Sequence, residues 1–367
     1  MYQYEDVRVV HLEITQRCQA GCPLCGRHDG DPINPYLTMA ELSLEDCKKI
    51  FKPSFLEQLN RIYMCGNFGD PIIAHDTLEI FKYFRSINST MWLAMHTNAG
   101  ARNVEWWQEL AKTMGENGTV IFSVDGLKDT NHIYRQNVNW EIVERSMRAF
   151  RDADGIARWD YIIFEHNKHQ FEEARAFAKE LGFDFFQTKK SDRFWNYKTL
   201  VANPEKGLIK QPTEKKYHNK SLKTEQVIEQ YGSVKNYYDQ TKIVCKVLGE
   251  KSVYISAEGL CLPCCWTASR LYRGRRPAGS QQIWNFVNDT GGKENINAIN
   301  NDIEDIINRN GMFGNIKNSW SCSSIEEGKL DVCAENCGTE LNSFKGMFEW
   351  NSRVPPWSVE LQKLFEE

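Results

Sequence analysis

The sequence predicts an α/β fold in which six strand–helix units form a parallel sheet and a smaller cysteine-rich region follows. The first observation is that short β-branched or aromatic runs alternate with amphipathic stretches over residues 7–190. Strands joined through helices lie parallel, with right-handed crossovers. The second observation is that a new group of cysteines begins at Cys245. Six units are fewer than the eight of a complete barrel.

The predicted elements follow one another without long gaps. Strands are expected at residues 7–14, 61–65, 91–96, 119–124, 159–164 and 184–187. Helices are expected at residues 44–59, 77–87, 104–114, 140–153 and 171–181. Ser43 is the expected N-cap of the first helix, because its hydroxyl can accept from a free backbone N–H. Gly182 is expected to end the last helix.

Length and charge narrow the class of protein. A chain of 367 residues can form one large domain and a smaller one. The net charge of -4 gives no general case for nucleic-acid binding. The N-terminus lacks the pattern of a signal peptide, and no apolar run has membrane-spanning length, so a cytoplasmic protein that does not bind membranes is expected. In that reducing compartment, twelve cysteines favour metal or cluster ligation over disulfides.

Three of these cysteines, Cys18, Cys22 and Cys25, have C-x3-C-x2-C spacing and directly follow the first predicted strand. Three thiolates on one short loop can bind an iron–sulfur cube and leave one iron open for reaction. The alternative is structural zinc, which closely spaced cysteines also bind. The spacing alone does not separate these two readings.

Polar residues follow every predicted strand. In parallel α/β sheets the carboxyl ends of the strands meet at one rim, so these residues are expected to surround the cysteine loop and bind a polar cofactor. In chain order, the segments after the second to the sixth strand are residues 66–71, 96–98, 123–126, 164–167 and 189–193.

These features together resemble the radical S-adenosylmethionine (SAM) superfamily over residues 7–193, which implies a partial (β/α)6 TIM-like barrel. Cys18, Cys22 and Cys25 resemble the family's cluster loop. The turn after the second strand resembles the family's Gly-Gly-Glu-Pro turn, whose backbone receives the methionine amino group of SAM. Its residues here are Gly66, Asn67, Phe68, Gly69, Asp70 and Pro71.

The resemblance extends to further residues of a SAM pocket. It implies that Ser123, Asp125 and Arg135 contact the ribose and carboxylate, and that Asn98 and Asn167 line the same pocket. The sequence departs from the family at two positions. Leu24 stands where an aromatic residue is common and is expected to cover adenine by apolar contact, and Asp70 replaces Glu in the turn.

The cysteine-rich region begins with a predicted β-hairpin at residues 253–262, with Gly259 at its turn. A hairpin brings its flanks together, so Cys245 and Cys264 can share one metal centre. Their C-x13-G-x4-C pattern, followed by a helix near residues 299–308 and by further cysteines, resembles the C-terminal SPASM or twitch extension of radical SAM enzymes.

A full SPASM domain with two auxiliary clusters has the pattern C-x2-C-x5-C-x3-C, whereas this chain has only Cys322 and then Cys333-x3-Cys337, so the resemblance implies one auxiliary 4Fe-4S cluster. Its expected ligands are Cys245, Cys264, Cys333 and Cys337. Cys322 is the main rival ligand, and Cys261 and Cys265 are lesser ones. Structural zinc bound by the same four thiolates is the alternative.

The predicted domain map has four parts: the radical SAM barrel at 1–193, a basic connector at 194–242, the SPASM/twitch-type domain at 243–345 and a tail or helix at 346–367. The connector contains Lys206, Lys210, Lys215, Lys216, Lys220 and Lys223. It is expected to be solvated. A sharper hypothesis is that it attracts an anionic substrate together with Arg270, Arg273, Arg275 and Arg276.

The resemblance implies an enzyme that cleaves SAM reductively and abstracts hydrogen from a substrate, with electrons from a donor such as flavodoxin or ferredoxin. The substrate is expected to be a peptide or protein, or a small molecule such as a sugar-type alcohol. Cys18 lies near Met1, so no separate leader-binding domain is expected before the barrel. A competing class is a zinc-stabilised binding protein without enzymatic activity.

Overall fold

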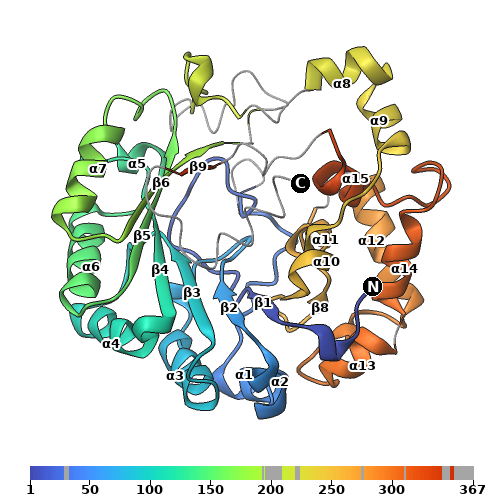
Figure 1. Ribbon diagram of the computed structural model, residues 1–367, viewed down its shortest axis with the longest axis horizontal. Coiled ribbons are helices and arrows are strands. Elements are labelled where there is room, and N and C mark those ends of the chain that lie inside the picture. Colours follow the sequence, from blue (N-terminus) through green and yellow to red (C-terminus); the bar gives the residue numbers. More distant parts are fainter. Residues whose placement is uncertain are drawn as a thin grey trace.

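The strands of the protein form one open sheet. The structure is a computed structural model that describes residues 1–28, 33–191, 194, 209–219, 224–273, 277–309, 311–340 and 348–350. In this described part, nine strands pair in the order β8-β7-β1-β2-β3-β4-β5-β6-β9 (Figure 1). Their bounds are β1 Val9–Leu12, β2 Arg61–Met64, β3 Trp92–Thr97, β4 Gly118–Ser123, β5 Ala157–Ile163, β6 Phe185–Lys190, β7 Ser252–Ile255, β8 Cys261–Leu262 and β9 Phe348–Trp350.

Strands β1 to β6 run parallel, as the alternation of strands and helices predicted. β7 adds a further parallel strand beside β1. The strands at the two ends of the sheet, β8 and β9, are antiparallel to their neighbours. The sheet does not close, so the prediction of an α/β partial barrel is confirmed.

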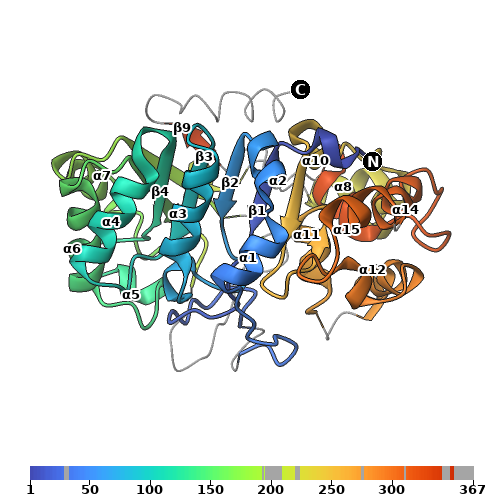
Figure 2. The same ribbon diagram turned by 90° about the horizontal axis from the view of Figure 1, so that it is seen from below.

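The helices pack outside the sheet or beside its β7 end. Helices α3, α4, α6 and α7 lie outside β2 to β6 in Figure 1, and α10, α11, α12, α14 and α15 lie beyond β1 in Figure 2. The bounds are α1 Leu44–Ile50, α2 Pro53–Gln58, α3 Thr77–Ile87, α4 Val104–Met114, α5 Asn131–Tyr134, α6 Trp140–Asp152, α7 Phe171–Glu180, α8 Thr224–Tyr231, α9 Val234–Gln240, α10 Lys246–Glu250, α11 Cys265–Arg270, α12 Pro277–Asp289, α13 Ile303–Asn308, α14 Met312–Ser319 and α15 Asp331–Cys337.

The predicted helix at residues 44–59 is wrong in one respect, because it is two helices, α1 and α2. Proline lacks a backbone N–H, and its ring clashes with the preceding turn of a helix. The chain therefore breaks before Pro53, which becomes the first residue of α2, where that N–H is not needed. The predicted N-cap is confirmed, since the Ser43 side chain accepts from the Asp46 N–H.

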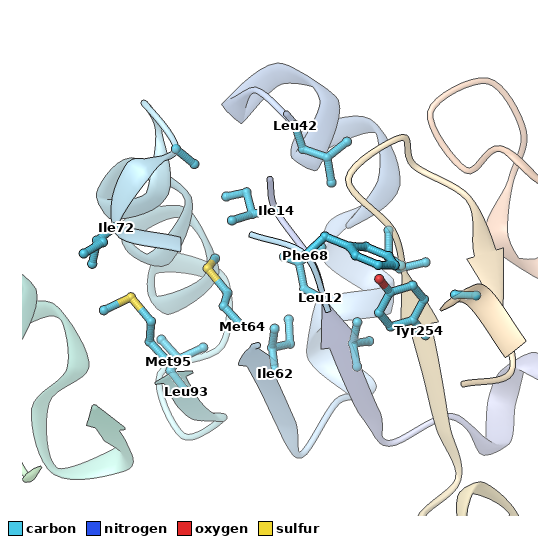
Figure 3. Packing of buried hydrophobic residues seen from close by; sticks show 14 of the residues in the cluster. Leu12, Ile14, Leu42, Ile62, Met64, Phe68, Ile72, Leu93, Met95 and Tyr254 are labelled. Atoms are coloured by element: carbon cyan, nitrogen blue, oxygen red, sulfur yellow. The ribbon is translucent and has the colours of Figure 1, made fainter. Parts of the chain in front are cut away.

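The two faces of the sheet differ in polarity. Figure 3 shows Ile62 and Met64 of β2 packed with Leu93 and Met95 of β3 in the buried core. Residues alternate between the two faces of a strand, so their neighbours in sequence point into the barrel. There the ring of His11 stacks on Tyr63 at 4.5 Å. The barrel interior is therefore more polar than the core outside it.

The cysteine-rich region is joined to the barrel by a strand and by a common core. The predicted hairpin forms as β7 and β8, with Gly259 at φ +81° at the turn between them. β7 pairs with β1 from Val9↔Ser252 to Leu12↔Ile255. One hydrophobic cluster runs from Tyr2 through the barrel to Cys333. The barrel and the cysteine-rich region thus share their sheet and core.

The basic connector contains two helices, α8 and α9, which the sequence analysis did not predict. Val227 and Tyr237 are buried together between them. Lys210, Lys215 and Lys216 belong to the described residues, whereas Lys206, Lys220 and Lys223 lie outside them.

Candidate active site

The cysteine loop follows β1 at the carboxyl ends of the parallel strands. This is the side of the sheet where α1 begins (Figure 2). Cys22 is buried, and Cys18 and Cys25 are partly exposed. Burial raises the pKa of Cys22 to about 11, although the charge of Arg135 opposes this. Without a metal the thiol is therefore protonated, and metal binding would displace its proton.

Amide and guanidinium groups point at the sulfur atoms of this loop. The Ala20 N–H lies 3.4 Å from the sulfur of Cys18, and Asn98 Nδ2 lies 3.6 Å from it. Arg135 Nη1 lies 3.8 Å from the sulfur of Cys22. Three thiols on one loop, with donors to the sulfur atoms, fit a cluster bound through three thiolates. Two residues expected in the SAM pocket, Asn98 and Arg135, thus contact the cysteine loop directly.

Arg135 also forms an ion pair with Asp125, which follows β4. Its Nε donates to Asp125 Oδ2 at 2.7 Å, and the Ile162 N–H donates to Asp125 Oδ1 at 2.6 Å. The Asp125 side chain is fully buried and that of Arg135 is 16% exposed. The buried carboxylate therefore fixes a guanidinium that remains accessible. Ser123, at the end of β4, is also partly exposed.

The turn at Gly66 to Pro71 brings backbone segments together too closely for side chains. A Cβ at Gly66 would lie 2.2 Å from the carbonyl oxygen of Gly69. A Cβ at Gly69 would lie 1.9 Å from the carbonyl oxygen of Thr15. The two glycines thus allow the turn to lie against the segment that leads from β1 to the cysteine loop.

Asp70 holds this turn in place through both carboxylate oxygens. Oδ2 accepts from the Asn98 N–H at 2.8 Å, and Oδ1 accepts from the Ile72 N–H at 3.2 Å. Asp70 is buried, and burial raises its pKa. The Asp70 carboxylate thus ties the turn to the backbone after β3 and to the backbone that follows the turn. Phe68 and Pro71 are buried as well, whereas Asn67 is partly exposed.

The two asparagines expected in the pocket differ in their surroundings. Asn98 lies at the cysteine loop, where its Oδ1 accepts from Gln19 Nε2 at 2.6 Å. Asn167 is buried behind Asp125, and its Nδ2 donates to the carbonyls of Asp125 and Ile162, both at 2.9 Å. Its Oδ1 accepts from the Phe164 N–H. The structure therefore places Asn98 beside the sulfurs and Asn167 in the scaffold of the loops. Leu24 is partly exposed.

Comparison with known proteins identifies the domain that contains the cysteine loop. Residues 12–178 match the family model described as the radical SAM superfamily. The chain contains a radical SAM domain. It is therefore an enzyme, and the superfamily that residues 12–178 match uses a 4Fe-4S cluster and SAM. No curated protein sequence matches the chain.

Solved structures share the fold of this radical SAM enzyme at low identity. Streptococcus suis SuiB bound to S-adenosylmethionine has a TM-score of 0.55 at 15% identity, covering 90% of this chain and 73% of that chain. SuiB bound to precursor peptide SuiA has a TM-score of 0.56 at 14% identity, covering 90% and 72%. Hexahistidine-tagged anSMEcpe with bound AdoMet has a TM-score of 0.51 at 13% identity, covering 98% and 92%. These likenesses establish the fold.

The interior of the radical SAM barrel contains Arg158 and Asp160, which the sequence analysis missed, beside Lys189 and His96 from two of the expected polar segments. Asp160 on β5 accepts from Arg158 at 2.5 and 2.8 Å, and Lys189 Nζ lies 2.5 Å from it. Burial opposes ionisation of Asp160, but these two cations outweigh it and hold its pKa well below the usual range. Burial and the Lys189 charge lower the pKa of His96 to about 3, so His96 is neutral. The sequence did contain a signal for this pair: Arg158 and Asp160 are two residues apart where a strand is predicted to begin, so their side chains point to the same face of the sheet.

The four cysteines expected to bind an auxiliary cluster lie together in the cysteine-rich region that begins at Cys245, which we call the extension. A hydrogen bond from Cys245 to Cys337 lowers the pKa of Cys337. Cys264 and Cys333 lie close enough that a thiolate at either position would raise the pKa of Cys245. Strand β8 and helices α10, α11 and α15 thus bring the predicted set into one neighbourhood.

The rival cysteines occupy other positions. Cys322 lies beside Gly328, and Cys261 is buried in β8. Cys265 interacts with Cys65 and Glu13 of the barrel as well as with Cys264. Among the described residues, no three Cys, His, Asp or Glu side chains converge as ligands of a single ion. In an iron–sulfur cube each thiolate binds a different iron, so its sulfur atoms need not converge on one point.

The arginines expected to attract an anionic substrate and the apolar character of the helices bear on what the chain could bind. Arg270, expected to help attract an anionic substrate, is buried and forms ion pairs with Glu335 and Asp331. Its charge is thus neutralised within the extension. Arg273 lies among the described residues, whereas Arg275 and Arg276 lie outside them. No helix in the part of the chain that the structure describes is long and apolar enough to cross a membrane.

Proposed function

We propose that this enzyme abstracts a hydrogen atom from a peptide, protein or small-molecule substrate and oxidises or modifies it with the help of an auxiliary 4Fe-4S cluster. The observation that supports this most directly is the meeting of Cys18 and Cys22 with Asn98 and Arg135 at the carboxyl ends of the strands. When bound, a reduced 4Fe-4S cluster supplies the electron that cleaves SAM to methionine and a 5'-deoxyadenosyl radical.

The chain's own residues would bind and orient SAM. Cys18, Cys22 and Cys25 hold the cluster, and the backbone of the Gly66 to Pro71 turn receives the methionine amino group. Arg135 is fixed by Asp125 and offers its guanidinium to the SAM carboxylate or ribose. Ser123, at the end of β4, would contact the same part of SAM. Leu24 covers the adenine. Asn98 lines the pocket next to Cys18.

The auxiliary cluster would use Cys245, Cys264, Cys333 and Cys337 as ligands. Their grouping in a region that shares the barrel's core supports this assignment. The cluster would accept an electron from the substrate after hydrogen abstraction, or it would shape the substrate pocket. Structural zinc at the same four thiols is the competing occupant.

The polar barrel interior favours a substrate with polar or charged groups. Arg158, Asp160 and Lys189 provide charges there, and neutral His96 provides a hydrogen-bonding ring. A peptide is one candidate, in line with SuiB, which was solved bound to precursor peptide SuiA. A sugar-type alcohol would also suit such an interior. We place the enzyme in the cytoplasm, with flavodoxin or ferredoxin as electron donor.

The first test measures 5'-deoxyadenosine. Anaerobically reconstituted protein, given SAM and a strong reductant, should produce it. The Cys22→Ala variant should produce none, because one of the three thiolates is missing. Equal product from both proteins, or none from wild-type protein that carries iron and sulfide even when candidate substrates are supplied, would contradict the proposal.

The second test separates the two metal centres. A variant with alanine in place of Cys18, Cys22 and Cys25 should retain labile sulfide, which an auxiliary 4Fe-4S cluster contains and zinc does not. Zinc without sulfide would reject the auxiliary cluster. Cys333→Ala should still cleave SAM but lose turnover of the substrate if the cluster accepts electrons.

A further inference from the structure

Glu13 is a buried carboxylic acid between the Gly66 to Pro71 turn and the extension. It directly follows β1 and is 1% exposed. Its Oε1 accepts from the Phe68 N–H at 2.7 Å and from the Gly69 N–H at 3.3 Å. Its Oε2 accepts from the hydroxyl of Tyr254, on β7. One side chain of the barrel thus joins the turn to the hairpin of the extension.

Other contacts between the turn and the extension lie close to this one. Asn67 Nδ2 donates to the carbonyl oxygen of Cys265 at 3.0 Å. The ring of Phe68 packs edge-on against Tyr272, with centroids 5.2 Å apart. Figure 3 shows Phe68 and Tyr254 in the same part of the core. The turn is therefore held from the β7 side over three successive residues, Asn67 to Gly69.

This support adds to that of Asp70, because the turn contains two glycines. Its glycines have no side chains to pack, and glycine is the most flexible residue. Its buried N–H groups require acceptors, since an unpaired buried donor is costly. A carboxylate is a strong acceptor for two neighbouring N–H groups. The Tyr254 hydroxyl in turn fixes the orientation of that carboxylate.

We propose that Glu13 is a positioning residue that sets the conformation of the SAM-binding turn, and that Tyr254 of the extension holds Glu13 in place. The inference rests on the proposed function for its SAM-binding part. It gives the extension a second task beside carrying the auxiliary cluster, because the extension keeps the turn ready for SAM. Glu13 itself would touch neither SAM nor the cluster.

The test uses three variants and a control. Glu13→Ala removes the acceptor, Glu13→Gln keeps an amide oxygen for the two N–H groups, and Tyr254→Phe removes only the hydroxyl. Tyr63→Phe is the matched control, because Tyr63 is another tyrosine of the barrel interior and stacks on His11 on the neighbouring strand. Two quantities are measured: amide hydrogen exchange at Phe68 and Gly69 in cluster-free protein, and the SAM Kd of reconstituted protein.

Glu13→Ala should speed exchange at both amides and weaken SAM binding by about tenfold, as expected for a lost hydrogen bond to a charged group. Iron and sulfide content should stay at the wild-type level. Tyr254→Phe should also speed exchange at both amides, and it should weaken SAM binding by about threefold. Glu13→Gln and Tyr63→Phe should resemble wild type in both quantities. Rescue by glutamine separates positioning of the turn from a general need for a buried charge.

Unchanged exchange at Phe68 and Gly69 in Glu13→Ala would overturn the inference. If that variant does not fold, Tyr254→Phe decides, and normal exchange together with normal SAM affinity overturns the inference. Failure of the proposed function looks different: wild-type protein with iron and sulfide would bind no SAM. That result would remove the SAM-binding part, and the exchange rates would still decide whether Glu13 holds the turn.

Discussion

Burial strongly affects the ionisation of Glu13. Burial raises its pKa to about 7, despite hydrogen bonds from Tyr254 and from backbone N–H groups that favour the carboxylate. Desolvation dominates because transfer of a charge from water into a protein interior costs more than a few hydrogen bonds return. The two thiols near it, those of Cys65 and Cys265, add no positive charge that would offset this cost.

This pKa shift predicts how stability depends on pH. The folded protein holds the Glu13 proton more tightly than the unfolded chain, whose reference pKa is 4.5. The stabilisation is complete below that value and is lost as pH rises through about 7. Between about pH 5 and pH 8, wild type should lose about 2 to 3 kcal/mol of unfolding free energy relative to Glu13→Gln. Urea unfolding of the cluster-free proteins measures this, and a difference that does not vary with pH would contradict it.

The site residues differ in how far sequence could identify them. Cys18, Cys22 and Cys25 were identifiable because a cluster loop is a local pattern. Asp70 and Asn167 follow predicted strands, but which atoms their side chains contact depends on the packing of neighbouring loops. Glu13 was missed because its partners lie far along the chain, 55 residues away at Phe68 and 241 residues away at Tyr254. No local spacing reveals such pairs.

At the scale of elements, the Gly66 to Pro71 turn is the most tightly constrained segment of the site. Gly69→Ala would place a methyl group 1.9 Å from the Thr15 carbonyl oxygen, and that atom is backbone and cannot turn aside. The turn must move away from the cysteine loop. We expect about tenfold or greater loss of SAM affinity and about 3 kcal/mol of destabilisation.

A matched glycine provides the control for Gly69→Ala. Gly314 lies in α14, and a Cβ there would have no neighbour within 4 Å. Gly314→Ala should leave SAM binding unchanged and stabilise the protein by up to about 1 kcal/mol, because alanine favours helices. SAM titration and thermal unfolding compare the two variants. Similar effects from both substitutions would show that the close approach at Gly69 is not limiting.

The elements were predicted well where a regular pattern governs them. Strands β1 to β6 and helices α3, α4, α6 and α7 lie within a few residues of the expected ranges. The helix at residues 44–59 was expected to be continuous because its apolar pattern runs on, whereas the missing N–H of Pro53 divides it. Helices α8 and α9 were missed because their mutual burial, and not a long apolar stripe, stabilises them.

At the scale of the whole molecule, the hairpin of the extension is part of the barrel. Sequence placed a boundary near residue 243, because the cysteine pattern begins there. The structure continues the parallel sheet from β1 to β7 across that boundary, and one hydrophobic cluster includes residues from both sides of it. Pairing of β7 with β1 joins segments about 240 residues apart, which a reading along the chain cannot detect.

This arrangement predicts that the barrel does not fold without the extension. A fragment of residues 1–242 would expose the edge of β1, where Val9 to Leu12 pair with β7, and would leave Glu13 without the Tyr254 hydroxyl. Exposed edges of apolar strands promote aggregation. The fragment should therefore be insoluble or lack a cooperative urea transition, whereas co-expression with residues 243–367 should restore solubility by supplying β7. A monomeric fragment that unfolds as cooperatively as the full chain would mean that the barrel is an independent domain, and that the shared strand only attaches the extension to it.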